Sequence, residues 1–447
     1  MKRIKRVFVA NRGEIALRIV NACQELGLET VVGTSEADRD GLAARRADRA
    51  VCIGPAPASE SYLRDDLVVQ AALGTECDAI HPGYGFLSES PKLAARASEN
   101  GLVFIGPPPE VIELSGDKLR ARDEAARAGV PILPGKEIGP GDDARQAADE
   151  IGYPVLVKAA GGGGGRGIKL AKDGDELDSL LSLARSEAGA AFGDERLYLE
   201  RFVANARHVE VQIAADEHGA VVHLGERDCS VQRRYQKVVE EAPAPNLDPA
   251  TRNALTAEAV AFATAIGYRN LGTVEFVLDV DTGEYFFLEV NCRIQVEHPV
   301  TEAVTGRDLV KLQIHIADGN ELGFSQNDVT FDGHAIECRL NAEDVAHGFM
   351  PSPGTLSLFA VPDHSHLRVD THLCAGSTIP PYYDSLMAKL IAHAEGREAT
   401  IDVLLEALED LDIEGVETNR ALLISVLAHE DFRRGAVSTD WLERAIV

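Results

Sequence analysis

Residues 288–297 alternate strictly between two kinds of side chain, and this pattern constrains the fold more than any other stretch of the chain. Successive side chains of a strand point to opposite sides, so the alternation predicts a strand with one face packed on a core. The other face would carry carboxylate, amide and guanidinium groups, which can bind a metal ion, bind an anion and transfer a proton. These polar residues are Glu289, Asn291, Arg293, Gln295 and Glu297.

A second alternating run, residues 272–279, precedes the first, and Asp281-Thr282-Gly283 between them is typical of a turn. A hairpin about Thr282 would place Glu275 opposite Glu289. Two carboxylates that face each other across a ladder destabilise it, unless a divalent cation lies between them. Oxygen ligands without Cys or His favour Mg²⁺ or Mn²⁺ over zinc. The alternative is an exposed acidic hairpin that holds no metal.

The composition excludes several classes of protein. The chain has 447 residues, enough for two or three domains, and 45% of them are hydrophobic. The formal net charge is −28, which opposes binding to nucleic acid or to an anionic membrane surface. No run approaches the roughly 20 apolar residues of a membrane span, and the basic start lacks the features of a secretory signal. Seven scattered cysteines without a C-x-x-C pair favour reduced thiols, so we expect a cytoplasmic protein.

The first unit, residues 1–115, is predicted to be a doubly wound parallel α/β sheet. Short apolar runs alternate with helical stretches there, as in parallel sheets with crossover helices. The loops 11–14 and 81–86 follow strands, where such folds bind ligands, although ordinary turn chemistry explains each loop alone. The expected strands are residues 7–10, 30–32, 51–53, 79–80 and 103–105.

Two further units are expected, residues 116–320 and an α+β unit of residues 321–447. Alternation over residues 334–340 places Arg339 on the polar face of a strand. Residues 131–141 are predicted to form a linker. The other expected strands are 155–158, 168–170, 209–213 and 220–224, and the expected helices are 142–151, 176–191, 399–411 and 419–429.

A loop of five consecutive glycines, residues 161–165, joins two of the expected strands. So many glycines are costly in conformational entropy and make sense where backbone N–H groups wrap around an anion. With Lys158 at its root, the loop predicts a mobile lid over nucleotide phosphates, and a flexible linker is the alternative. Lys118 begins a predicted helix and is a second candidate phosphate ligand. Lys237 lies in a basic run of an acidic chain, and we expect it to be buried in a site.

Over essentially the whole chain these motifs resemble the ATP-grasp superfamily, and closely the biotin carboxylases. The resemblance rests on Gly116-Asp117-Lys118, the glycine loop, the Glu-Glu-Ala-Pro run that begins at Glu240, and Arg293-x-Gln295-Val-Glu297-His-Pro. It implies an N-terminal Rossmann-like domain (1–115), a central ATP-grasp domain (116–320, with its lid at about 133–203) and a C-terminal α+β domain (321–447).

The resemblance implies a reaction in which ATP phosphorylates bicarbonate to carboxyphosphate, and the CO₂ released from it is attacked by biotin N1. Tyr235 departs from the family, since many members have His at this position. The implied nucleotide contacts are Lys118, Lys158, Gly164, Gly165, Glu200, Arg201, Val203, His208, Gln232 and Tyr235, and the implied ligands of two Mg²⁺ or Mn²⁺ ions are Glu275, Glu289 and Asn291. The implied bicarbonate pocket is Lys237, Arg293, Gln295 and Val296, with Glu297 as the base, Arg339 as the stabiliser of the biotin enolate and Tyr84 as a further substrate contact.

The resemblance also implies partners: a biotin carboxyl carrier protein, carboxyltransferase subunits and a second copy of the chain. We expect an acetyl-CoA carboxylase complex; the alternatives are complexes acting on propionyl-CoA, another acyl-CoA or pyruvate. Since Met1, Met350 and Met387 lie in no Met-Lys-Met tripeptide, the biotin is expected on another polypeptide or segment. Two rivals stay open, an ATP-grasp ligase joining a carboxylate to an amine and a non-catalytic nucleotide-binding subunit.

Overall fold

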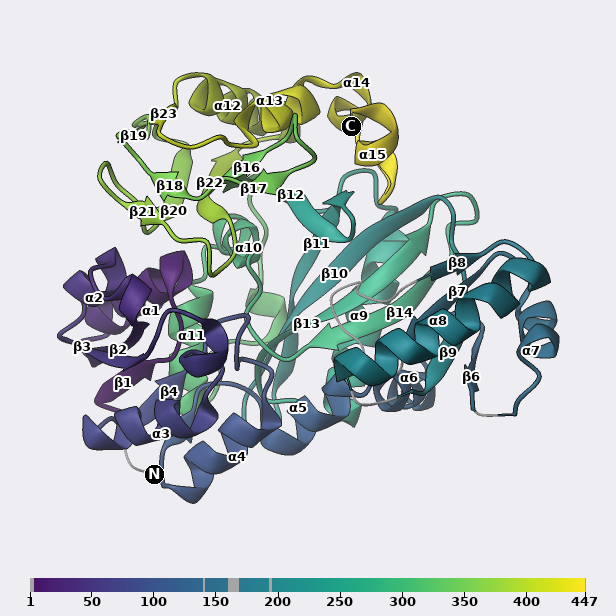
Figure 1. Ribbon diagram of the computed structural model, residues 1–447, viewed down its shortest axis with the longest axis horizontal. Coiled ribbons are helices and arrows are strands. Elements are labelled where there is room, and N and C mark those ends of the chain that lie inside the picture. The colour runs from purple at the N-terminus through teal and green to yellow at the C-terminus, as the bar shows by residue number, and fades with distance from the viewer. Residues whose placement is uncertain (1–3, 140, 160–168, 193–194, 447) are drawn as a thin grey trace.

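The computed structural model of the protein describes residues 4–139, 141–159, 169–192 and 195–446 (Figure 1). The N-terminal unit is a five-stranded sheet in the order β3-β2-β1-β4-β5, and all of its neighbouring strands are parallel. This confirms the predicted parallel α/β sheet. Its elements are β1 (Arg6–Val9), α1 (Gly13–Glu25), β2 (Glu29–Ser35), α2 (Leu42–Arg46), β3 (Arg49–Gly54), α3 (Asp65–Gly74), β4 (Ala79–His81), α4 (Pro91–Glu99), β5 (Val103–Phe104) and α5 (Pro109–Gly116).

After α6 (Lys118–Arg127), a small antiparallel unit projects from one side of the molecule, at the right of Figure 1. Its sheet has the order β6-β9-β7-β8 and its own apolar core. The prediction of a linker over residues 131–141 is wrong for part of that range, because residues 135–138 form strand β6 and pair with β9. The elements are β6 (Gly135–Ile138), α7 (Ala144–Ile151), β7 (Val155–Ala159), β8 (Lys169–Ala171), α8 (Gly174–Phe192) and β9 (Leu197–Arg201).

The largest sheet has eight antiparallel strands in the order β14-β13-β10-β11-β12-β15-β22-β20. It runs without a break across residue 320, because β12 pairs with β15. The strands are β10 (Ala206–Ala215), β11 (Val221–Arg233), β12 (Gln236–Ala242), β13 (Asn270–Asp279), β14 (Tyr285–Asn291), β15 (His334–Asn341), β20 (Leu367–Thr371) and β22 (Leu386–Ala394).

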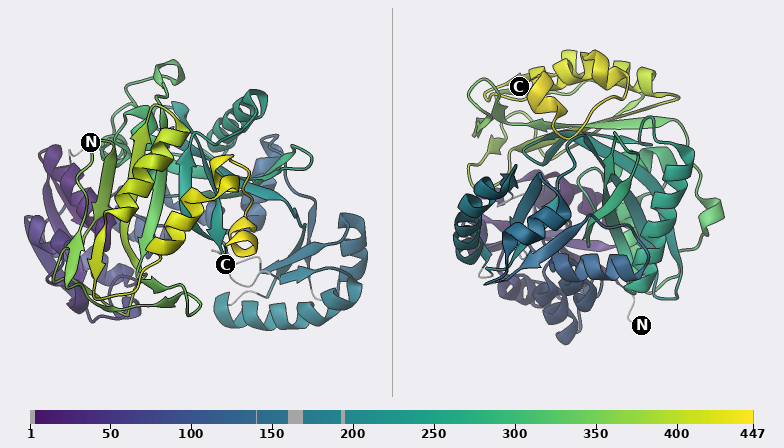
Figure 2. Two further views of the ribbon diagram at one scale, coloured as in Figure 1. Left: turned by 90° about the horizontal axis from the view of Figure 1, so that it is seen from above. Right: turned by 90° about the vertical axis from the view of Figure 1, so that its right-hand side faces the viewer.

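Helices cover this sheet and join it to the N-terminal unit. α12 packs on β15 and β22 and lies beside α13, as the yellow helices over the green strands show in Figure 2. α11 contacts both α1 and β13. The helices are α9 (Pro249–Ala265), α10 (His298–Thr305), α11 (Leu309–Ala317), α12 (Arg397–Glu409), α13 (Arg420–Ala428), α14 (Glu430–Arg433) and α15 (Trp441–Ala445). Short strands complete the C-terminal part: β16 (Glu343–Asp344), β17 (Met350–Pro351), β18 (Gly354–Thr355), β19 (Leu358–Ala360), β21 (Thr378–Ile379) and β23 (Asp412–Glu414). Among the described residues, no helix has the length and apolarity needed to cross a membrane.

Candidate active site

The hairpin of β13 and β14 places Glu275 directly opposite Glu289, as the sequence predicts. The turn is closed by a 2.8 Å hydrogen bond from the Gly283 N–H to the Asp279 carbonyl. Glu275 is buried, whereas Glu289 is half-buried and lies 3.1 Å from Lys118 Nζ. Lys118 is the first residue of α6, which Asp117 caps. The two facing carboxylates therefore differ, since one is buried and the other is paired with a cation at the edge of the site.

The strand predicted over residues 288–297 is wrong beyond Asn291, where β14 ends. The chain then turns, and Gln295 and Glu297 become buried. Asn291 Nδ2 and Gln295 Nε2 donate hydrogen bonds of 2.8 and 3.1 Å to the same oxygen of Glu275. Because buried polar groups need partners, these contacts satisfy the side-chain amides that the turn brings into the interior.

The ammonium group of Lys237, on β12, lies at the centre of an acidic cluster. It donates to Glu210 at 2.6 Å, to Glu275 at 3.0 Å and to Glu297 at 2.6 Å. Burial alone would lower the pKa of Lys237, but these carboxylates outweigh it and raise the pKa well above its usual value. Lys237 therefore stays charged and holds three strands and the turn before α10 together.

Glu297 is bound by a second cation. Its other carboxylate oxygen accepts a 2.9 Å hydrogen bond from Arg339 Nη2, and Arg339 Nε donates at 2.6 Å to Glu240. Burial would raise the pKa of Glu297, but Lys237 and Arg339 lower it well below its usual value. Glu297 is therefore an ionised carboxylate shielded from water.

Three charged residues complete the cluster and were not among the site residues predicted from the sequence: Glu210, Arg227 and Glu240. Arg227 is fully buried and donates to Glu210 at 2.6 Å, and Glu240 is the partner of Arg339. A signal existed for Glu210, because residues 209–213 alternate like residues 288–297 and place it on a polar strand face. The positions of Arg227 and Glu240 depend on pairing between strands, which a local pattern does not encode.

His208 and Gln232 lie at the edge of this cluster. His208 Nε2 is 2.9 Å from Glu275 Oε2, and the Gln232 amide nitrogen is 2.8 Å from His208 Nδ1. Burial alone would lower the pKa of His208, but the Glu275 carboxylate raises it above the usual value. These two predicted nucleotide residues therefore belong to the edge of the carboxylate cluster.

Arg293 lies over the turn that follows β14. Its guanidinium donates to Gln295 Oε1 at 2.6 Å and to Asn291 Oδ1 at 3.0 Å, and lies 3.1 Å from Glu89. The Val296 carbonyl accepts a 2.9 Å hydrogen bond from Lys389. The structure thus brings all four predicted bicarbonate-pocket residues, Lys237, Arg293, Gln295 and Val296, to one turn and the strands beside it.

A cavity lies between the projecting unit and the large sheet. Lys158, on β7, pairs with Glu200, on β9, and both line the cavity with Lys118. Its other lining residues are Leu119, Arg122, Ala159, Tyr198, Phe287 and Leu288. Basic groups on an apolar surface suit the phosphates and base of a nucleotide.

The other predicted nucleotide residues lie at chain turns. Arg201 ends β9, and Val203 lies in the connection to β10. Tyr235 is 57% exposed in the turn between β11 and β12, with φ +66°. Gly164 and Gly165 lie outside the residues that the structure describes.

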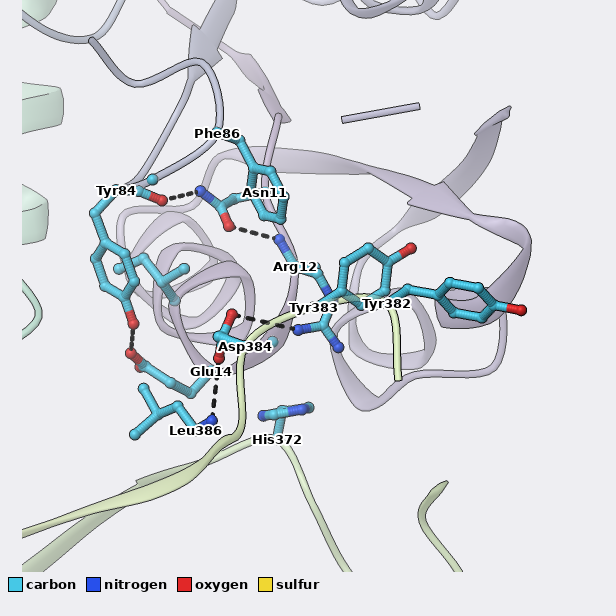
Figure 3. A pocket seen from close by; sticks show the side chains of 13 residues that line it. Asn11, Arg12, Glu14, Tyr84, Phe86, His372, Tyr382, Tyr383, Asp384 and Leu386 are labelled. Atoms are coloured by element: carbon cyan, nitrogen blue, oxygen red, sulfur yellow. Dashed lines mark hydrogen bonds and ion pairs between the residues drawn. The ribbon is translucent and has the colours of Figure 1, made fainter. Parts of the chain in front are cut away.

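Tyr84 lies in a separate pocket between the N-terminal unit and residues 372–386 (Figure 3). Its hydroxyl donates to Glu14, which lies 3.1 Å from the buried Lys389 Nζ. Since Lys389 also binds the Val296 carbonyl, Tyr84 is linked to the bicarbonate pocket through buried polar groups.

The donor set of the hairpin fits a hard divalent cation. Glu275 and Glu289 face each other across the ladder, and Asn291 adds an amide group, whose nitrogen donates to Glu275 and whose oxygen accepts from Arg293 in this structure. All three supply oxygen, which Mg²⁺ and Mn²⁺ prefer. Within the described ranges, two further groups bring ligand atoms close together: His208, Glu210 and Glu275, and Glu210, Cys229 and Glu297. The first adds a nitrogen and the second a thiol, so neither suits Mg²⁺ as well.

The fold and this site define an ATP-grasp ligase. Residues 117–324 match the family model of the ATP binding domain of the carbamoyl-phosphate synthase L chain. Residues 3–112 and 337–444 match the models of the biotin carboxylase N-terminal and C-terminal domains.

Relatives extend this match over the whole chain. The biotin carboxylase of Pseudomonas aeruginosa is 48% identical over 446 residues, which cover 99% of each chain. The biotin carboxylase domain dimer of the Hydrogenobacter thermophilus 2-oxoglutarate carboxylase, solved with MgADP, ADP and bicarbonate, is similar with a TM-score of 0.95 at 46% identity, covering 99% of this chain and 98% of that one. The biotin carboxylase of Campylobacter jejuni, solved as a β-γ-ATP complex, gives a TM-score of 0.96 at 42% identity over 99% of both chains. The chain belongs to the biotin carboxylase family, whose members are ATP-dependent enzymes.

Proposed function

We propose that this chain uses ATP and bicarbonate to carboxylate biotin on a carrier protein, through carboxyphosphate. One observation supports this proposal above all others: Glu297 is a buried, ionised carboxylate held between Lys237 and Arg339. A carboxylate between two cations is suited to take a proton from an anionic substrate that the same cations attract.

Lys237, Arg293, Gln295 and the Val296 backbone are proposed to bind bicarbonate. In the substrate-free structure the donors of Lys237 are all engaged by carboxylates. When bicarbonate takes one of these donors, Glu297 loses part of its cationic partner and its pKa rises. Glu297 then accepts the bicarbonate proton, the bicarbonate oxygen attacks the γ-phosphorus of ATP, and ADP leaves with the bonding electrons.

Nucleotide binding is proposed for the cavity between the two sheets. Lys118 and Lys158 would contact phosphates, and Glu200 to Val203 would contact adenine partly through the backbone. His208 and Gln232 would lie on the ribose side, as the resemblance implies; in the structure they contact each other, and His208 contacts Glu275 of the carboxylate cluster. Such positioning and charge neutralisation provide most of the catalysis of phosphoryl transfer.

Glu275, Glu289 and Asn291 are proposed to hold Mg²⁺ or Mn²⁺, with room for two ions only if ATP phosphates supply further oxygens. The bound metal would neutralise charge on the transferring phosphoryl group. Glu289 is paired with Lys118 in this structure, so a metal ion would compete with that lysine for the carboxylate.

Carboxyphosphate then cleaves to CO₂ and phosphate, the phosphate or a base takes the proton of biotin N1, and N1 attacks CO₂. Arg339 is proposed to stabilise the enolate that biotin forms as this proton leaves. Its guanidinium is fixed from behind by Glu240 and directs Nη2 toward Glu297. Each fixed donor to a developing oxyanion contributes roughly 3–4 kcal/mol. Tyr84 would contact the biotin substrate from the neighbouring pocket.

For partners we propose a biotinylated carrier, carboxyltransferase subunits and a second copy of the chain, in the cytoplasm, with acetyl-CoA as the final acceptor. The second candidate is a 2-oxoacid, favoured by the similarity to the biotin carboxylase domain of the Hydrogenobacter thermophilus 2-oxoglutarate carboxylase; pyruvate is another 2-oxoacid. Purification of the native complex and assay with each acceptor separates the two candidates.

Labelled bicarbonate tests the proposed reaction. The purified chain, given ATP, Mg²⁺ and a biotinylated carrier domain, should transfer label to the carrier's biotin in a form that acid releases as CO₂. A label that appears instead as a stable amide would favour a ligase joining carboxylate to amine. Nucleotide binding without any labelled product would favour the non-catalytic subunit.

A further inference from the structure

Two buried glutamates face each other directly behind Arg339. Glu240 on β12 and Glu337 on β15 are opposite residues of an antiparallel ladder, and both are 0% exposed. The Cβ atoms of opposite residues lie about 5 Å apart, and their side chains share one face of the sheet. Arg339, two residues along β15, is on that same face.

The hydrogen bonds of this pair leave three carboxyl oxygens without a partner. Glu240 Oε1 accepts from Arg339, but Glu240 Oε2 and both oxygens of Glu337 have no hydrogen-bond partner among the described residues. An ionised carboxylate buried without donors is very costly. One proton on Glu337 removes its charge and supplies an O–H that can donate toward Glu240.

The surrounding cations are already engaged by other groups. Lys237 binds three carboxylates, Arg339 binds Glu240 and Glu297, and Lys389 donates to the Val296 carbonyl and lies 3.1 Å from Glu14. The charged and titratable groups that act on the pair are Lys237, Cys229, Glu297, Cys338, Arg339 and Lys389. Lys389 in turn is surrounded by Glu14 and Asp370. Each of these three cations is shared with other groups, and none of the three donates to Glu337, so the surroundings favour a neutral Glu337.

Burial raises the pKa of both glutamates. The pKa of Glu240 rises to about 7 although Arg339 opposes the shift, and the pKa of Glu337 rises well above its usual value although Lys389 opposes it. Glu240 keeps the charge because Arg339 donates to it. The direction of both shifts agrees with the unpartnered oxygens.

We propose that Glu240 and Glu337 share one proton, carried on Glu337, and that this pair is the positioning device of Arg339. With Glu337 neutral, Glu240 is the one charged carboxylate behind the guanidinium, and its Oε1 pairs with both Nε and Nη2 of Arg339. Nη2 also donates to Glu297, so the guanidinium is held between the two carboxylates. The role of Arg339 in this inference rests on the proposed function; the shared proton does not.

Infrared difference spectroscopy and unfolding against pH test the shared proton without any activity assay. At neutral pH, the difference spectrum of wild type minus Glu337→Gln should show the carbonyl band of a protonated carboxylic acid. A carboxyl with a raised pKa makes the folded state less stable as pH rises from the unfolded pKa of about 4.3 toward the folded one. The urea midpoint of Glu337→Gln, relative to wild type, should therefore rise with pH above about 5.

Glu241→Gln is the matched control. Glu241 is the next residue of β12 and also buried, but His334 and Arg397 outweigh burial and lower its pKa. That substitution should give no acid band, and its urea midpoint should lie below the wild-type value at every pH above about 5. Two results would overturn the shared proton. One is the absence of the acid band in the spectrum of wild type minus Glu337→Gln. The other is a urea midpoint of Glu337→Gln that falls, relative to wild type, as pH rises.

Kinetics test the positioning role. Glu240→Gln should lower kcat by about 100-fold, since misplacement of a catalytic group by 1 Å can cost that much, with KM for ATP little changed. Glu240→Asp should restore part of the loss. In wild type, kcat should decline at alkaline pH, where Glu337 loses its proton, and Glu337→Gln should show no such decline. If Glu240→Gln instead raises KM for ATP with kcat intact, the pair does not position Arg339. If wild type shows no carboxylation while the acid band is present, the proposed function fails and the shared proton stands.

Discussion

Lys237 Nζ lies 2.6 Å from Glu297 Oε1, so in the substrate-free protein the proposed base is paired with the proposed anion-binding cation. The same ammonium group also binds Glu210 and Glu275. Three carboxylates of the cluster therefore share the one ammonium group of Lys237. Bicarbonate must compete with these carboxylates for that ammonium group. Several expected outcomes depend on this arrangement.

Replacement of Lys237 should destabilise the fold in a pH-dependent way. Lys237→Met removes the cation that three buried carboxylates share, so that Glu210, Glu275 and Glu297 keep only their other partners, which costs roughly 3–5 kcal/mol of unfolding free energy. The carboxylate pKa values then rise, so stability should fall as pH rises above about 5 and recover in mild acid. Urea unfolding measures the effect. Lys136→Met, which removes only an exposed pair 3.5 Å from Glu150, should cost less than about 1 kcal/mol, and an equal loss in both variants would refute the central role of Lys237.

Loss of one metal-ligand charge should abolish turnover without unfolding the protein. Glu289 is half-buried at the edge of the site, so Glu289→Gln should fold normally. We expect ATP cleavage to fall by roughly 100-fold or more, because the charge on the phosphoryl group is then poorly neutralised. Glu284→Gln, in the same hairpin but exposed, is the control. Wild-type turnover in Glu289→Gln would reject the metal assignment.

Local sequence patterns predict the hairpin well, because both of its strands and its turn have recognisable patterns within one short segment of the chain. The alternation of two runs and the turn signal at Asp281-Thr282-Gly283 are sufficient to place Glu275 opposite Glu289. The parallel N-terminal sheet was predicted for the same reason, since its apolar strands and helices follow one another along the chain.

Long-range pairing explains what the sequence did not reveal. Residues 135–138 are a strand only because β9 lies beside them, and β14 ends at Asn291 because Gln295 and Glu297 find buried partners elsewhere. The pair of Glu240 with Glu337 depends on β12 joining β15. An acidic residue on a strand gives no local sign that its strand will be buried on both faces.

Tyr235 should tolerate replacement by the residue common in the family. Its ring is exposed in a turn with positive φ, away from the buried charges of the cluster. Tyr235→His should change nucleotide affinity by no more than about tenfold, or ~1.4 kcal/mol. Calorimetric titration with ADP measures the change. A complete loss of binding would show that Tyr235 has a direct role in the nucleotide site.

The most direct test of the account is ATP cleavage measured with each substrate omitted in turn, for wild type and for Glu297→Gln. We predict that wild-type cleavage requires bicarbonate and Mg²⁺ and is stimulated by free biotin. Glu297→Gln should lose this cleavage by about 100-fold or more while it still binds ATP. Cleavage by wild type that ignores both bicarbonate and biotin, or a Glu297→Gln variant that cleaves ATP at the wild-type rate, would contradict the account.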